Sequence, residues 1–241
     1  MASYLLVLLV GLVAGCISGV IGTGSSLMLL PVLVYAFGPL QAVPIMAVAA
    51  IMGNLARVAV WWKEVDWRAF AAYSLPAIPA ASLGARTLLG LPPQAIELAL
   101  GVFFLCMIPL RRWHLKTLIR LQLWHLALAG AVIGFLTGLV LSTGPLSVPV
   151  FLSYGLDRGA FLSTEAASSL VIYISKVITF QQLGALPVEV ALQGVLVGSS
   201  LMAGTYAGKI VVTRMSRHAF VHVLDALMLC SGLSMLWAAW R

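Results

Sequence analysis

A succession of long apolar segments separated by short loops constrains the fold of this chain more than any other feature. A membrane-spanning helix needs about 20 apolar residues, and eight segments reach or approach that length. They are Tyr4–Ile21, Pro44–Trp62, Trp67–Leu88, Pro93–Leu110, Leu123–Leu141, Ser163–Gln182, Pro187–Val211 and His218–Trp240. Charged residues make up only 9% of the chain, against about 25% in soluble domains. The sequence therefore predicts an all-α polytopic protein, multi-pass in the cell (inner) membrane, with the lipid bilayer as its surroundings.

Two shorter apolar segments each follow a break rich in glycine and hydroxyl residues. Leu27–Phe37 follows the break GTGSS, and Leu146–Leu156 follows the break STGP. Segments of 10–14 residues more often re-enter the membrane than cross it. We expect a short broken or re-entrant helix after each break, and the length alone leaves open whether it crosses.

The two halves of the chain repeat one another. Pro31 of the first short segment matches Pro149 of the second at an offset of 118 residues, and the helices that follow match at an offset of 119. Each half then has four long transmembrane helices and one short helix. We predict one integral membrane domain with residues 1–110 as the first repeat, 111–122 as a basic cytoplasmic linker and 123–241 as the second repeat.

Loop charges indicate that the two repeats are inverted. Lys63 and Arg68 follow a first-half helix, whereas the corresponding second-half loop, QQLGALP, has no charge. If each half crosses the membrane an odd number of times, most basic residues fall on the cytoplasmic side, with Arg86 and Arg241 opposite. The sequence therefore favours inverted repeats with both termini outside.

Two cations lie inside apolar helices at repeat-related positions. Arg57 matches Lys176 at the offset of 119, and Asn54 and Tyr173 lie one turn before them. A charge at bilayer depth costs from about 3 kcal/mol upward, so it persists where it pairs, faces water or binds a counter-ion. We interpret the two cations as counter-charges for a small anionic substrate, with Asn54 and Tyr173 as further contacts. The alternatives are an internal pair with an acid and a snorkelling side chain.

The two breaks point to the same kind of site. A helix begins after each break, and helix N-termini attract anions through unpaired N–H groups. Broken helices in corresponding positions of two halves are typical of a transporter binding site, although small residues also serve close helix packing. The predicted substrate-binding residues of the breaks and of the Lys176 helix are Gly22, Thr23, Gly24, Ser25, Ser26, Ser142, Thr143, Gly144, Ser168 and Ser169.

A few other residues qualify for proton coupling. Glu165 is expected in the first turn of the helix Ser163–Gln182, and Asp225 lies one turn after His222 in the last apolar segment. An interhelical hydrogen bond is the alternative for His222 and Asp225.

Several function classes are disfavoured. The three cysteines stand alone without a CxxC or Cys/His cluster, so no metal or other cofactor is predicted. No HExxH, GxSxG or paired-carboxylate pattern appears, so we do not expect an enzyme. The net charge of +7 comes from basic residues between helices, which is typical of membrane flanks and does not predict nucleic-acid binding.

Two glycine-rich, proline-ending motifs, GVIGTGSSLMLLPVL and STGPLSVPVFL, resemble those of the TauE/SafE family of membrane permeases, often called sulfite exporters. The turn KEVDW, Lys63 to Trp67, is similar to that family's G-x-V-D-W-like turn. The resemblance covers essentially the whole chain and implies a secondary transporter of sulfite, sulfonates or related organic anions, with alternating access and export as the expected direction. The alternative is a non-transporting membrane subunit or scaffold with internally paired charges. Substrate, coupling ion and homo-oligomer formation stay open.

Overall fold

The structure is a computed structural model that describes residues 2–21, 25–92, 94–96, 98–102, 105–106, 121–140, 144–156 and 158–211, together with residues 229, 233, 236, 237 and 240. Its long helices are α1 (Ala2–Ile21), α3 (Pro39–Trp61), α4 (Trp67–Leu89), α6 (Leu123–Val140), α8 (Arg158–Gln182) and α9 (Val188–Val211). The structure also has two short helices, α2 (Ser25–Phe37) and α7 (Gly144–Tyr154), and the 3-10 turn η1 (Trp62–Glu64). Within these ranges there is no strand, and the prediction of an all-helical protein is confirmed.

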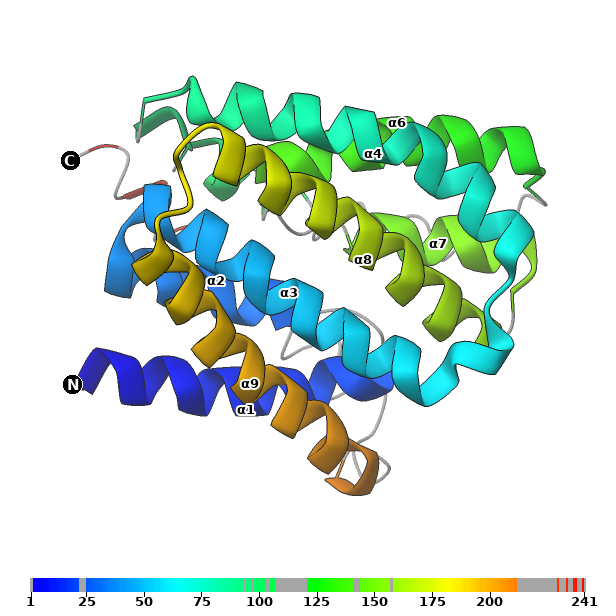
Figure 1. Ribbon diagram of the computed structural model, residues 1–241, viewed down its shortest axis with the longest axis horizontal. Helices are drawn as coiled ribbons and strands as arrows, with labels where there is room; N and C mark the ends of the chain where they lie inside the picture. The colour runs from blue at the N-terminus through cyan, green and yellow to red at the C-terminus, as the bar shows by residue number, and fades with distance from the viewer. Residues whose placement is uncertain are drawn as a thin grey trace.

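Long helices form this bundle (Figure 1), and many large apolar side chains are exposed on its outside. Three stretches in the described part of the chain are long and apolar enough to cross a membrane: Leu40–Ala59, Gly159–Gln182 and Val188–Ala207. Large apolar side chains such as Leu75 and Leu192 are more than half exposed. A bilayer accepts such side chains, and helices satisfy their own backbone polar groups there. The chain is a multi-pass membrane protein.

The two short helices have the lengths that the sequence predicts for half-crossings. Helix α2 has 13 residues and α7 has 11, which correspond to about 20 Å and 17 Å. A hydrocarbon core of about 30 Å exceeds both lengths. Residues 22–24 and 142–143 of the two predicted breaks, part of the predicted segment Pro93–Leu110 and most of the predicted segment His218–Trp240 lie outside the described residues.

Two predicted helix starts are wrong by five residues. Helix α3 begins at Pro39 and not at Pro44, because Gly38 with φ 78 ends the preceding helix and proline suits the first helical position. Helix α8 begins at Arg158 and not at Ser163, shortly after Gly155 with φ 108. Arg158 suggested a loop but is the first residue of the helix. Glu165 therefore lies in the third turn of α8 and not in the first.

The centre of the bundle is the crossing of α3 with α8, and their chain directions are opposed (Figure 1). The loop after α3 reaches the start of α8, where the Asp66 amide donates to the Thr164 hydroxyl at 2.9 Å. The Asp66 carboxylate also caps α4 by accepting from the Arg68 and Ala69 amides at 3.0 Å. The KEVDW turn thus fixes the ends of three helices relative to one another.

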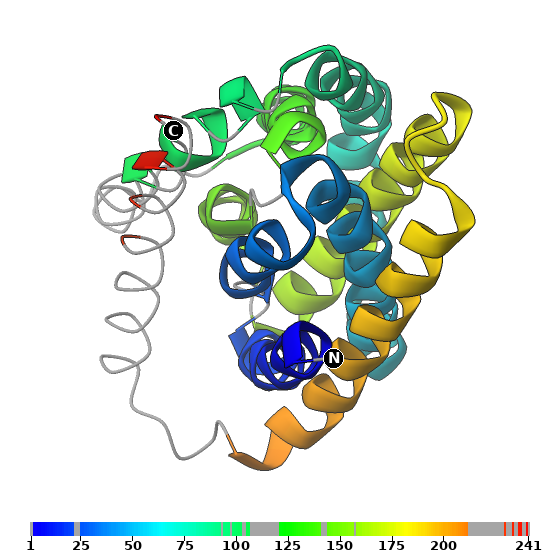
Figure 2. The ribbon, with the colours of Figure 1, turned by 90° about the vertical axis from the view of Figure 1, so that its left-hand side faces the viewer.

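The outer helices pack in two similar pairs, α1 against α9 and α4 against α6. Figure 2 shows α1 (dark blue) beside α9 (orange), so that segments from opposite ends of the chain lie side by side. Glycines bring the backbones together: a Cβ on Gly84 would clash with the Phe135 carbonyl, and one on Gly138 with the Ala81 carbonyl. Small residues at helix contacts are typical of membrane proteins.

Substitution of Gly138 is expected to destabilise the bundle. A Gly138→Val change forces a side chain into the backbone of α4, and overpacking of this kind costs about 1–3 kcal/mol or more. We expect a lower melting temperature of the purified protein. The control is Gly53→Ala in α3, where a Cβ meets nothing within 4 Å and where alanine is expected to stabilise the helix by about 0.5–1 kcal/mol. Equal melting of the two variants would contradict the packing argument.

Candidate functional site

A buried ion pair joins α3 to α8 at the crossing of the two helices. The Arg57 Nη1 atom lies 3.0 Å from the Glu165 Oε2 atom, and the two residues are only 6% and 2% exposed. The antiparallel crossing places the last turns of α3 against the first turns of α8, which brings these two residues together. Of the alternatives left open by the sequence, internal pairing with an acid is the one that the structure shows for Arg57.

Neighbouring polar groups hold both members of the pair. The second Glu165 oxygen, Oε1, accepts from the Ser169 hydroxyl at 2.8 Å and lies 3.4 Å from the Ser147 hydroxyl. The Arg57 Nη2 atom donates to the Asn54 Oδ1 atom, and the Asn54 amide donates in turn to the Ala50 carbonyl at 2.8 Å. Asn54 thus orients the guanidinium of Arg57, and the carboxylate of Glu165 is held from α7 and from its own helix.

Both short helices contribute a hydroxyl to this buried region. Ser26 is the second residue of α2 and is hydrogen-bonded to the side chain of Tyr173, and Ser147 is in the first turn of α7. The broken-helix pattern predicted that the two helix starts would approach the buried charges. Ser147 itself was not predicted, although it lies only two residues after the second break.

Lys176 is enclosed in a different part of α8, about three turns or 16 Å from Glu165 along the helix. Its side chain is 0% exposed. The Nζ atom donates to the Thr137 carbonyl of α6 at 2.7 Å and lies 5.4 Å from the centre of the Phe180 ring. No described carboxylate lies within ion-pairing distance of it. A carbonyl and a ring face stabilise an ammonium by partial charges only.

The predicted repeat offers a reason why no described acid pairs with Lys176 as Glu165 pairs with Arg57. The offset of 119 residues that relates Arg57 to Lys176 relates Glu165 to Met46. Met46 is in α3 and is wholly buried. The second half therefore supplies the Glu165 carboxylate to Arg57 of the first half. At the matching position the first half has the Met46 thioether, which cannot form an ion pair with Lys176.

Two buried hydroxyls near the α4–α8 contact have no hydrogen-bond partner among the described residues. They belong to Ser168, which is 0% exposed, and Ser74, which is 2% exposed. Ser168 lies one turn after Glu165 on α8. A buried unsatisfied hydroxyl costs about 1–3 kcal/mol, so each of these groups is suited to a polar ligand.

Some of the remaining predicted site residues lie within the described part of the chain, and the others lie outside it. Ser25 is half-buried at the start of α2, and Gly144 begins α7. Gly22, Thr23, Gly24, Ser142, Thr143, His222 and Asp225 lie outside the described residues. Sequence reasoning missed Thr137 and Phe180; the spacing of four residues from Lys176 could have identified Phe180. In the described part of the chain no three His, Cys, Asp or Glu side chains are grouped to hold a metal.

Comparison with known families gives one match. The family described as Sulfite exporter TauE/SafE matches residues 7–235, which is nearly the whole chain. No curated protein and no solved structure matched significantly.

Proposed function

The chain belongs to the sulfite exporter TauE/SafE family, a family of membrane transporters and not of enzymes, and on this premise we propose how it moves its substrate. It is a secondary transporter that exports a small sulfur-containing or organic anion, such as sulfite or a sulfonate, across the cytoplasmic membrane. Where the cell interior is negative, the membrane potential lowers the free energy of each exported negative charge by about 2.3 kcal/mol per 100 mV. The membrane potential therefore favours export.

The burial of Lys176 without a carboxylate partner among the described residues is the observation that carries this proposal. A lysine in this position is costly unless a negative group joins it. The substrate anion supplies that charge, and its oxygens receive the further hydrogen bonds that the ammonium can donate. The unsatisfied hydroxyl of Ser168 lies one turn after Glu165 on the same helix, so it supports contact with the oxygens of the anion near the Arg57–Glu165 pair.

The Arg57–Glu165 pair gives the transporter a group that can couple transport to protons. While Glu165 is ionised it neutralises Arg57, and the Ser169 and Ser147 hydroxyls support it. A proton on Glu165 would release the guanidinium to bind the anion with Asn54 and Tyr173 beside it. Proton binding and anion binding would then favour each other. Asp225 and His222 stay candidates for the same role.

Alternating access follows from the two halves. Residues 1–110 and 123–241 form inverted repeats in one membrane domain, joined on the cytoplasmic side by 111–122. The opposed directions of α3 and α8 and the similar pairs α1–α9 and α4–α6 support this arrangement. The starts of α2 and α7, with Ser25, Ser26 and Gly144, line the anion path together with the breaks, and one half rocks against the other around it.

The competing hypothesis is a scaffold whose buried charges are all paired internally, and the ion pair of Arg57 favours it in part. Ligand-dependent melting separates the two hypotheses. A transported anion at one hundred times its dissociation constant is expected to stabilise the folded protein by about 2.7 kcal/mol. We expect a clear rise in melting temperature with sulfite or a sulfonate in a panel that includes sulfate and carboxylates.

Chloride at matched ionic strength is the control for this screen, because it tests whether any anion suffices. The Lys176→Met variant is the second control and should lose the rise. A flat melting temperature across the whole panel would favour the scaffold.

A further inference from the structure

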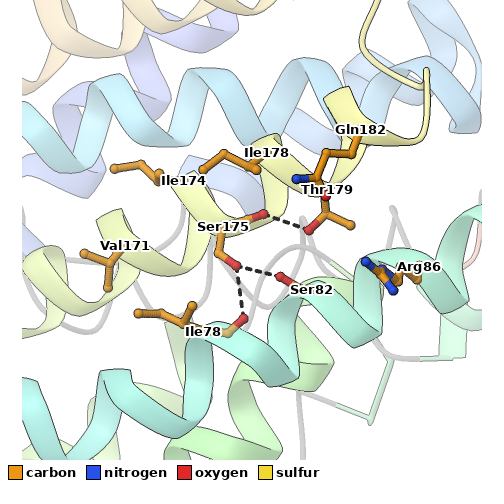
Figure 3. A pocket seen from close by; sticks show the side chains of 9 residues that line it. All are labelled: Ile78, Ser82, Arg86, Val171, Ile174, Ser175, Ile178, Thr179 and Gln182. Carbon is orange, nitrogen blue, oxygen red and sulfur yellow. Dashed lines mark hydrogen bonds between the residues drawn. The ribbon is translucent and has the colours of Figure 1, made fainter.

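A groove follows the contact between α4 and α8 on the bundle surface (Figure 3). Its volume is about 360 Å³. Its walls are aliphatic: Ile78 comes from α4, and Val171, Ile174 and Ile178 come from α8. Ile174 and Ile178 are 38% and 47% exposed. The neighbouring Lys176 points elsewhere and is buried, so the groove is separate from the proposed substrate site.

One end of the groove is polar and the other is apolar. Figure 3 shows Arg86, Thr179 and Gln182 at one end, and Val171, Ile174 and Ile78 at the other. Arg86 is exposed in the last turn of α4, and Gln182 is the last residue of α8. The polar end therefore lies where both helices end, at the membrane surface. No described carboxylate is within ion-pairing distance of Arg86.

Hydroxyls in the floor of the groove are already hydrogen-bonded within the protein. The Ser82 and Ser175 hydroxyls lie 2.7 Å apart, and Ser175 also donates to the Ile78 carbonyl at 3.0 Å. Because these groups need no water, a hydrocarbon chain can cover them without leaving a polar atom unsatisfied.

The dimensions of the groove match one leaflet of a membrane. The distance from Val171 to Gln182 along α8 is about 16 Å, and half of a hydrocarbon core of about 30 Å is about 15 Å. An occupant would need an anionic group at the surface and a hydrocarbon chain that points to the bilayer centre.

We propose that this groove binds one anionic phospholipid, with its phosphate at Arg86 and one acyl chain between α4 and α8. The aliphatic walls contact the chain, and the cation selects an anionic headgroup over a zwitterionic one. Any lipid contacts an apolar helix surface, but a groove that ends at a cation also gives a preference for a negative headgroup.

Lipid binding to the full-length protein in detergent tests the proposal. Phosphatidylglycerol and phosphatidylcholine with identical acyl chains are compared by native mass spectrometry and by melting temperature. We expect phosphatidylglycerol to bind about fivefold more tightly, since one surface cation contributes about 1 kcal/mol. Arg86→Gln should remove the preference, and Ile178→Trp should fill the groove and weaken both lipids.

Arg68→Gln is the matched control, because it makes the same change in the first turn of the same helix at the opposite membrane surface. The preference should persist in this variant. An equal loss with Arg68→Gln, or no loss with Arg86→Gln, would overturn the proposal. So would equal stabilisation by soluble glycerol phosphate, which would indicate a site for free anions. Sulfite-dependent melting of Arg86→Gln should stay unchanged, which keeps this test independent of the transport proposal.

Discussion

Lys176→Met is expected to abolish most anion transport while the protein stays folded. Loss of one partner of a buried, hydrogen-bonded charge pair costs about 2–5 kcal/mol of binding, so the substrate should bind at least about 30-fold more weakly. Methionine fills a similar volume without a charge. Because Lys176 has no carboxylate partner among the described residues, removal of its charge should not lower stability. Flux of sulfite or a sulfonate into proteoliposomes at subsaturating concentration measures the effect.

Lys63→Met is the matched control for this flux experiment. Lys63 is exposed and lies near the Trp62 ring at the membrane surface, so the same chemical change there should leave transport within about twofold of the original rate. If Lys176→Met transports the anion as fast as the unchanged protein and shows the same ligand-dependent melting, Lys176 does not bind the substrate.

Glu165→Gln is expected to cause the largest loss of stability. The change leaves Arg57 buried without its carboxylate, and such a loss costs about 3–5 kcal/mol. Arg57→Met should also destabilise, whereas the double variant Arg57→Met/Glu165→Gln should be more stable than the sum of the single effects predicts. An interaction free energy of about 2 kcal/mol or more is expected from this cycle, measured by denaturation of the purified protein.

Glu189→Gln, an exposed change in the first turn of α9, is the control and should not affect stability. Strictly additive single changes would show that the ion pair does not couple α3 to α8. The double variant also tests proton coupling: it should transport the anion more slowly, because the Arg57 guanidinium is gone, and its remaining flux should not respond to an imposed pH difference. Continued response to pH would assign the coupling to another group.

The sequence predicted the helical class, the two short helices and the repeat-related cations because these depend on local composition and on spacing along the chain. It misplaced Glu165 because Arg158 and Asp157 suggested a loop, although Gly155 with its positive φ already provides the turn. A membrane helix that is buried in protein at its end tolerates charged residues that would mark the end of a lipid-facing helix.

The surroundings of Lys176 could not be predicted in the same way. Its acceptor is the backbone carbonyl of Thr137 on another helix, and a backbone group has no side-chain signature. The partner of Arg57 was closer to prediction, since the offset of 119 residues pairs Glu165 with Met46. Matching the two positions identifies the second half as the one with the acid. The antiparallel crossing of α3 and α8 is needed to show that Glu165 reaches Arg57 of the first half.

The difference between Met46 and Glu165 has a consequence for the ancestry of such a chain. A dimer of two identical chains would have the same side chain at both positions that correspond to Met46 and Glu165. An acid there would neutralise the cations of both copies, and a methionine would neutralise neither. If the two predicted repeats arose from such copies, their fusion in one gene would allow each half to change its side chains independently. On the proposed function, Arg57 then kept a carboxylate partner within the protein while Lys176 stayed available to the substrate, an arrangement that a dimer of identical chains cannot have.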